Sequence, residues 1–148
     1  MKSKQWLTGM ALVMLAFPFS ARAVLGGDVA SVHSDRAELN AALRTTPANQ
    51  FTQFDLQLPS GTTVREYVSA TGAVFAVSWD GPSLPDLRLL LGSYFQQYRD
   101  AVRSGGVGAR VVKQPGLVVY TGGHMRAFRG RAYVPQLLPP GVAAEEIR

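Results

Sequence analysis

Residues 56–79, LQLPSGTTVREYVSATGAVFAVSW, carry the pattern that predicts the fold. Apolar and polar residues alternate along short runs, which are separated by tight turns at Pro59-Ser60-Gly61 and at Thr71-Gly72. In a β-strand every second side chain lies on the same face of the sheet. The stretch therefore predicts an antiparallel meander, and residues 51–58 extend it by a first strand.

The register of the meander follows from the length of its turns, where glycine supplies the left-handed backbone. A three-residue loop at the first turn sets Asp55 opposite Arg65. A two-residue loop would set Asp55 opposite Glu66, and two like charges in that position cost stability. We expect the pairs Leu56–Val64, Asp55–Arg65, Glu66–Val77, Val64–Trp79 and Val68–Phe75. One face is then the core, with the carboxylate of Glu66 in its middle, and it collects Leu56, Leu58, Val64, Val68, Phe75, Val77 and Trp79.

The first 23 residues have the features of a secretory signal peptide. Lys2 and Lys4 precede an apolar run from Trp6 to Phe19, and Ala21-Arg22-Ala23 has the pattern of a cleavage site. The run is shorter than the roughly 20 residues that span a bilayer. We expect an exported protein, periplasmic or secreted, with no membrane span after cleavage.

The mature chain, residues 24–148, has the size of one domain. Removing 23 of the 148 residues leaves 125, and the chain has no cysteine for disulfides or a lipid anchor. Cleavage also removes three basic residues, so 12 Lys and Arg face 10 Asp and Glu. A net charge of +2 does not indicate nucleic acid as a partner.

We expect one helix before the meander in the sequence and one after it. Residues 28–43 are interpreted as an N-terminal helix, with a capping box of Asp35 and Glu38 if the helix starts late. Residues 45–50 form a turn-rich link. Residues 84–103 have the strongest helical period, because apolar residues recur three and four positions apart. We predict an α+β fold in which a mostly antiparallel sheet, the meander plus later hairpins, packs on this long amphipathic helix.

Two hairpins are expected after the long helix. The first joins residues 109–113 to 117–121 around Gln114-Pro115-Gly116. The second covers residues 124–134 and turns at Arg129-Gly130. Its expected pairs are Met125–Val134 and Ala127–Ala132 on one face, and Arg126–Tyr133 and Phe128–Arg131 on the other. A helical stub follows over residues 142–148.

Short motifs along the mature chain point to one family. They are Leu58-Pro-Ser-Gly, Arg65-Glu-Tyr, Val74-Phe-Ala-Val, Leu84-Pro-Asp-Leu, Leu91-Gly-Ser-Tyr-Phe and Gly122-Gly-His-Met-Arg-Ala-Phe. With this combination the chain resembles the small exported proteobacterial proteins grouped as domain of unknown function 2844. The resemblance implies an exported protein of the bacterial envelope, but no activity and no catalytic residues.

The first candidate site surrounds a pair of glycines. Backbone N–H groups of paired glycines can converge on an anion, and arginine adds bidentate donors. Aromatic rings beside the arginines suit a sugar or an aromatic-lined partner surface. The candidate binding residues are Gly122, Gly123, His124, Arg126, Phe128, Arg131 and Tyr133. The alternative interpretation is a glycine turn before an edge hairpin whose charges only solvate it.

The second candidate is Glu66. Burial would raise the pKa of this carboxyl, and a perturbed carboxylate in a cleft is a candidate functional group. The alternative is structural, because an arginine from the helix or a place at the open end of the sheet would satisfy it without any function.

Motifs for catalysis and metal binding are mostly missing. The chain has no G-x-S-x-G, no G-x-x-x-x-G-K and no cysteine, and its two histidines, His33 and His124, lack ligand spacing. We therefore expect no metal and no cofactor. The preferred function is a non-enzymatic module that binds an envelope partner, either a protein or an anionic glycan. A small secreted hydrolase with His124 as its base is the alternative.

Overall fold

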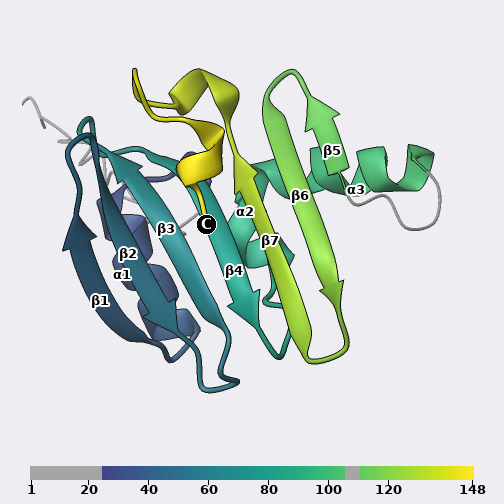
Figure 1. Ribbon diagram of the computed structural model, residues 1–148, viewed down its shortest axis with the longest axis horizontal. Helices are drawn as coiled ribbons and strands as arrows, with labels where there is room; N and C mark the ends of the chain where they lie inside the picture. The colour runs from purple at the N-terminus through teal and green to yellow at the C-terminus, as the bar shows by residue number, and fades with distance from the viewer. Residues whose placement is uncertain (1–24, 106–110) are drawn as a thin grey trace, which may run out of the picture.

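One seven-stranded antiparallel sheet with its helices on one face forms the fold of the computed structural model, which describes residues 25–105 and 111–148 (Figure 1). The strand order is β1-β2-β3-β4-β7-β6-β5. The strands are β1 (Ala42–Pro47), β2 (Phe51–Gln57), β3 (Thr63–Ser69), β4 (Val74–Gly81), β5 (Val111–Gln114), β6 (Leu117–His124) and β7 (Ala127–Tyr133). The α+β prediction is confirmed. The signal peptide predicted over residues 1–23 lies outside the described residues.

The meander formed by β2, β3 and β4 has the predicted register except near its second turn. Strand pairing places Asp55 opposite Arg65 and Glu66 opposite Val77, as expected. A β-bulge then pairs Val68 with Val74, and Phe75 is the extra residue of β4. Because a bulge opposes two residues to one, the alternation of the strand shifts at this point. The pair Val68–Phe75 is therefore wrong, and Phe75 lies on the face opposite to the helices.

The N-terminal helix α1 (Val29–Glu38) is shorter than predicted, and a strand follows it. Asp28 caps the helix, since its carboxylate accepts from the backbone N–H of Ser31 at 2.9 Å. The predicted capping box is therefore wrong, and Asp35 is a buried residue of the helix interior. The strand β1 falls where we expected the helix end and a link. It is an edge strand whose side chains are mostly exposed, so it lacks the apolar alternation that reveals a strand.

The long helical stretch after β4 covers residues 87–104, close to its predicted bounds. It divides into α2 (Leu87–Leu91), the 3-10 turn η1 (Gly92–Tyr94) and α3 (Phe95–Ser104). Asp86 begins it by accepting from the backbone N–H of Arg88 at 2.8 Å, and Gly92, with a φ of 45°, interrupts it. The apolar residues that gave this stretch its helical period pack in the core between the helices and the sheet. They are Leu87, Leu90, Leu91, Tyr94, Phe95, Tyr98 and Val102. Among the described residues no helix is long and apolar enough to cross a membrane.

The last hairpin has a different register from the predicted one. It turns at Met125-Arg126, where His124 pairs with Ala127, and Arg129-Gly130 lies inside β7. Gly123, with a φ of 107°, makes this turn possible, because a Cβ there would overlap the backbone of Ala127. Four predicted pairs are therefore wrong: Met125–Val134, Ala127–Ala132, Arg126–Tyr133 and Phe128–Arg131.

The face of the sheet opposite to the helices, which we call the outer face, is partly covered by the C-terminal segment. This segment crosses in front of the sheet in Figure 1 and contains two 3-10 turns, η2 (Pro135–Leu137) and η3 (Ala144–Glu146). Ile147 is 1% exposed and packs with Tyr67, Phe75 and Ala76 in a second apolar cluster. The sheet therefore has a core on both sides, whereas the sequence predicted one apolar face.

Candidate functional site

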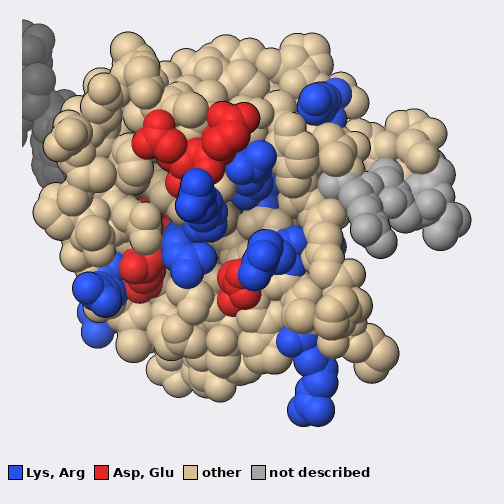
Figure 2. Space-filling view, in the orientation of Figure 1, with Lys and Arg blue, Asp and Glu red and all other residues tan. Residues whose placement is uncertain are grey.

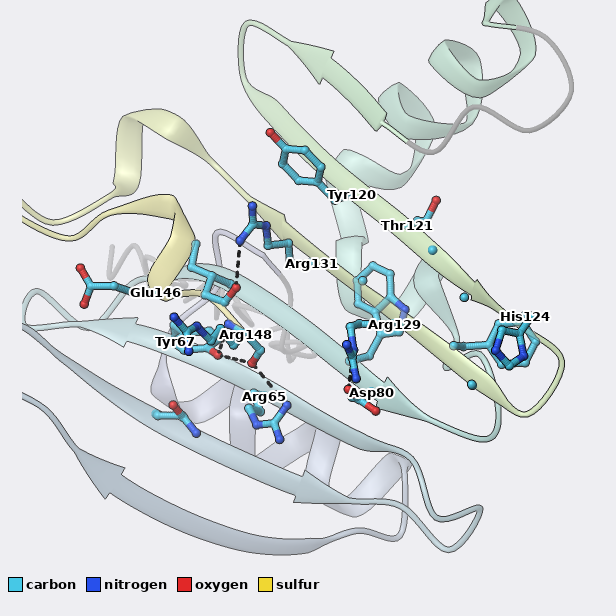
Figure 3. A pocket seen from close by; sticks show the side chains of 18 residues that line it. Arg65, Tyr67, Asp80, Tyr120, Thr121, His124, Arg129, Arg131, Glu146 and Arg148 are labelled. Carbon is cyan, nitrogen blue, oxygen red and sulfur yellow. Dashed lines mark hydrogen bonds and ion pairs between the residues drawn. The ribbon is translucent and has the colours of Figure 1, made fainter.

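An open groove of about 1090 Å³ lies on the outer face (Figure 3). Strands β3, β4, β6 and β7 contribute to its floor, and Glu146, Ile147 and Arg148 of the C-terminal segment line it as well. The groove is therefore built from segments that are far apart in the sequence. It extends from the middle of the sheet to the turn between β6 and β7.

Strand register places one row of polar side chains across the outer face. Each member is the partner of the next on the neighbouring strand: Arg44, Asp55, Arg65, Ser78, Arg131 and Tyr120. Paired residues of antiparallel strands project to the same face, so these side chains lie side by side. Figure 2 shows that basic and acidic groups gather in the middle of this face. Within the row, Arg65 Nε is 3.5 Å from Asp55 Oδ1.

Arg129 is an exposed charged residue of the groove. Its Nε donates to Asp80 Oδ2 at 2.6 Å, and its side chain is 78% exposed. Gly122 is its partner on β6, and without a side chain there the backbone beside the guanidinium stays uncovered. The contact with Asp80 uses only Nε, which leaves the two terminal nitrogens of Arg129 suited to a bidentate contact with a carboxylate or phosphate.

Arg131 holds the C-terminal segment. Its Nη1 donates to the carbonyl oxygens of Ala144 at 3.0 Å and Ile147 at 3.3 Å. Its guanidinium carbon is 4.7 Å from the centre of the Tyr120 ring, which is a cation–π contact. Burial raises the pKa of the nearby Tyr133, and Tyr120 adds to this shift. Arg131 is thus an internal contact and not the free surface arginine that the sequence suggested.

Five of the seven predicted binding residues line the groove, namely Gly122, Gly123, His124, Phe128 and Arg131, whereas Arg126 and Tyr133 do not. Arg126 lies in the turn, and Tyr133 lies at the other end of β7. The glycine pair also differs from the expected anion-binding loop, because Gly122 and Gly123 belong to β6 and pair with β7.

Tyr67 and Asp80 also line the groove, and sequence reasoning missed both of them. Both have the alternating position that places them on the outer face, and this was the only available signal. Their role depends on partners from β7 and from the C-terminal segment. Neither partner can be inferred from the meander alone.

Glu66 lies on the helix side of β3, away from the groove, and is 1% exposed. Its pKa is raised from 4.5 to about 8, mainly by burial and in addition by the negative charge of Asp35 and a hydrogen bond with Asp35. The partner is therefore a second carboxyl group, from α1, and not an arginine of the long helix, which was one of the two structural alternatives. Both groups are buried.

His124 is exposed at the end of the groove. Its Nδ1 is 3.3 Å from the carbonyl oxygen of Met125 in the adjoining turn. Within residues 25–105 and 111–148, no three His, Asp or Glu side chains are grouped so that they could hold a metal ion. The described part of the chain therefore provides no ligand set for a metal ion around His124.

Comparison with known proteins gives one match. Neither the curated proteins nor the solved structures contain a match to this chain. The family model described as "Protein of unknown function (DUF2844)" matches residues 21–147, which is most of the chain and includes every strand of the sheet. The chain belongs to this family of proteins of unknown function, DUF2844.

Proposed function

We propose that the protein is an exported, non-enzymatic module that binds an envelope partner through the groove on the outer face. The observation that carries this proposal is the groove itself, an open surface of about 1090 Å³ with arginine and aromatic side chains in its lining. Arginine and aromatic residues are enriched at recognition surfaces. Export is supported by the signal-peptide pattern of residues 1–23.

The charge of the groove favours a partner that carries acidic groups. Four arginines line it, Arg65, Arg129, Arg131 and Arg148, against the acidic residues Asp80 and Glu146, a net charge of +2. Charge complementarity of this kind steers association and orients the partner. Carboxylates of a protein and carboxylates of an anionic glycan both satisfy it.

Hydrolysis by His124 has less support. A hydrolase needs a nucleophile beside its base and a third group that orients the base. The groove residues that the structure describes include no serine, and the carboxylate of Asp80 is engaged by Arg129. His124→Ala with loss of ester or glycoside hydrolysis would be the result that favours this alternative.

The test is capture of partners from an envelope extract by cross-linking, with the wild type, Arg129→Ala and Arg103→Ala compared. Arg103 is an exposed arginine of α3, so its replacement is a matched control for the loss of one positive charge away from the groove. We expect Arg129→Ala to lose the captured species and Arg103→Ala to keep them, with added salt weakening capture. Equal capture by all three proteins would overturn the proposal.

A further inference from the structure

We propose that the outer face holds a peptide-binding site, which the protein's own C-terminal segment, residues 142–148, occupies in cis. The external ligand is an extended segment of a protein chain with an aliphatic side chain in the place of Ile147. This inference rests on the proposed function, because the site adjoins the groove. It names a protein as the partner class.

The site contacts mainly the backbone of its occupant. Arg131 donates to two carbonyl oxygens of the segment, those of Ala144 and Ile147. Contacts to main-chain oxygens are available from any peptide and do not depend on its side chains. The arginine itself is held in place by the ring of Tyr120.

Hydroxyl groups of the sheet complete the backbone contacts. The hydroxyl of Tyr67 donates to the carbonyl oxygen of Arg148 at 2.7 Å and accepts from its backbone N–H at 3.0 Å. Ser78 Oγ donates to the same oxygen at 2.7 Å. Arg65 Nη1 also donates to it, at 3.3 Å (Figure 3). Tyr67 and Ser78 are nearly inaccessible to solvent. With the segment in place, these two hydroxyl groups are therefore buried at its contact with the sheet.

Ile147 is the buried anchor of the segment. It is 1% exposed and packs with Tyr67, Phe75 and Ala76, and Val142 packs against the same cluster while partly buried, whereas Glu145 and Glu146 are exposed. An apolar surface of this kind favours an aliphatic side chain. The site therefore selects the occupant's sequence mainly at the place of Ile147, and other chains that meet this condition can compete for it.

The groove gives a competing chain an advantage over the segment. The last residues of the segment line one side of the groove, and Arg129 lies further along it with its side chain exposed. A peptide that replaces the segment and continues into the groove can place an acidic side chain against Arg129. It then gains a contact with Arg129 that the segment does not make.

Competition from the protein's own segment should lower the apparent affinity of the site for an added peptide. A tethered occupant has an effective concentration on the order of millimolar, so a peptide added in trans meets a site that is mostly filled. Weakening the tethered segment should expose the site without changing its walls. The effect is measurable as a change in affinity for a copy of the segment.

The experiment measures fluorescence anisotropy of a labelled peptide with the sequence of residues 139–148, PPGVAAEEIR. We expect the full chain with Ile147→Ala to bind this peptide at least tenfold more tightly than the wild type. Adding Arg131→Ala to that variant should remove the gain, and so should using a peptide that itself carries Ile147→Ala. Equal affinity of the wild type and the Ile147→Ala chain, or a gain that survives Arg131→Ala, would overturn the proposal.

A second measurement covers the case in which Ile147→Ala disturbs the fold. In the wild type, an excess of unlabelled peptide should speed hydrogen exchange of the Arg148 amide, whose N–H donates to the hydroxyl of Tyr67. Unchanged exchange would contradict displacement of the segment.

If the wild type forms dimers by exchanging segments, the occupant is a second copy and the external ligand is refuted. Loss of peptide binding with intact capture through Arg129 refutes this inference alone. Peptide binding without such capture refutes the proposed groove.

Discussion

Replacing Glu66 with glutamine should remove a pH dependence of folding stability that the buried carboxyl pair creates. Glutamine has nearly the same shape, can still hydrogen-bond to Asp35, and does not titrate. In the wild type the folded chain raises the pKa of Glu66 from 4.5 to about 8, first through burial and then through Asp35. The variant isolates this one group from all others that titrate.

The sign follows from the direction of the shift. Between pH 4.5 and about 8 the folded chain keeps a proton on Glu66 that the unfolded chain has released. The contribution of Glu66 to stability is therefore fully present below pH 4.5, declines as the pH rises, and is lost above about pH 8. The slope is at most about 1.4 kcal/mol per pH unit, so a rise from about pH 5.5 to 7.5 costs roughly 2–3 kcal/mol.

Urea denaturation at several pH values in this window is the assay. The free energy of unfolding of Glu66→Gln minus that of the wild type should grow by roughly 2–3 kcal/mol from about pH 5.5 to 7.5. Glu38→Gln is the control, because Glu38 is an exposed carboxylate on the helix that carries Asp35, and it should follow the wild type within about 0.5 kcal/mol. A difference for Glu66→Gln that stays constant over the window would refute the reasoning.

Three further outcomes are expected. Gly130→Ala should cost about 1–3 kcal/mol in urea denaturation, because its Cβ would overlap the buried ring of Trp79, whereas Gly116→Ala has open space and should be near neutral. Phe95→Ala should cost about 1–3 kcal/mol, less than for a fully buried ring, since Phe95 packs on the core but stays half-exposed; a change below about 0.5 kcal/mol would contradict this packing. Exported material should begin at Val24 by N-terminal sequencing, and a retained first methionine would contradict the signal peptide.

Local signals in the sequence were sufficient for the first half of the sheet and for the long helix. The register of β2 and β3 follows from the length of the turn between them and from the pairing of Asp55 with Arg65. Both signals lie within a dozen consecutive residues. The helical stretch after β4 follows from apolar residues that recur three and four positions apart, a spacing that places them together on one face of a helix but not on one face of a strand. Turn geometry and side-chain period act between neighbours along the chain, so they can be worked out without the fold.

The position of the last turn needed the tertiary structure. Gly123 and Gly130 are both compatible with a hairpin turn, and the sequence alone favoured Arg129-Gly130. Strand β7, however, pairs with β4 on one side and β6 on the other, and Gly130 is needed where Trp79 packs against the strand. The choice therefore depends on two neighbouring strands at once.

Contacts between segments that are distant along the chain also could not be predicted from the sequence. Periodicity predicted that Glu66 is buried, but only the packing of α1 on the sheet brings Asp35 to it. In the same way, alternation places Tyr67 on the outer face, but only the return of the C-terminal segment brings Arg148 to its hydroxyl and Ile147 to its ring. The sequence determines which face each side chain takes, because that depends on the local backbone. What each side chain meets depends on contacts between distant segments, and these exist only in the folded chain.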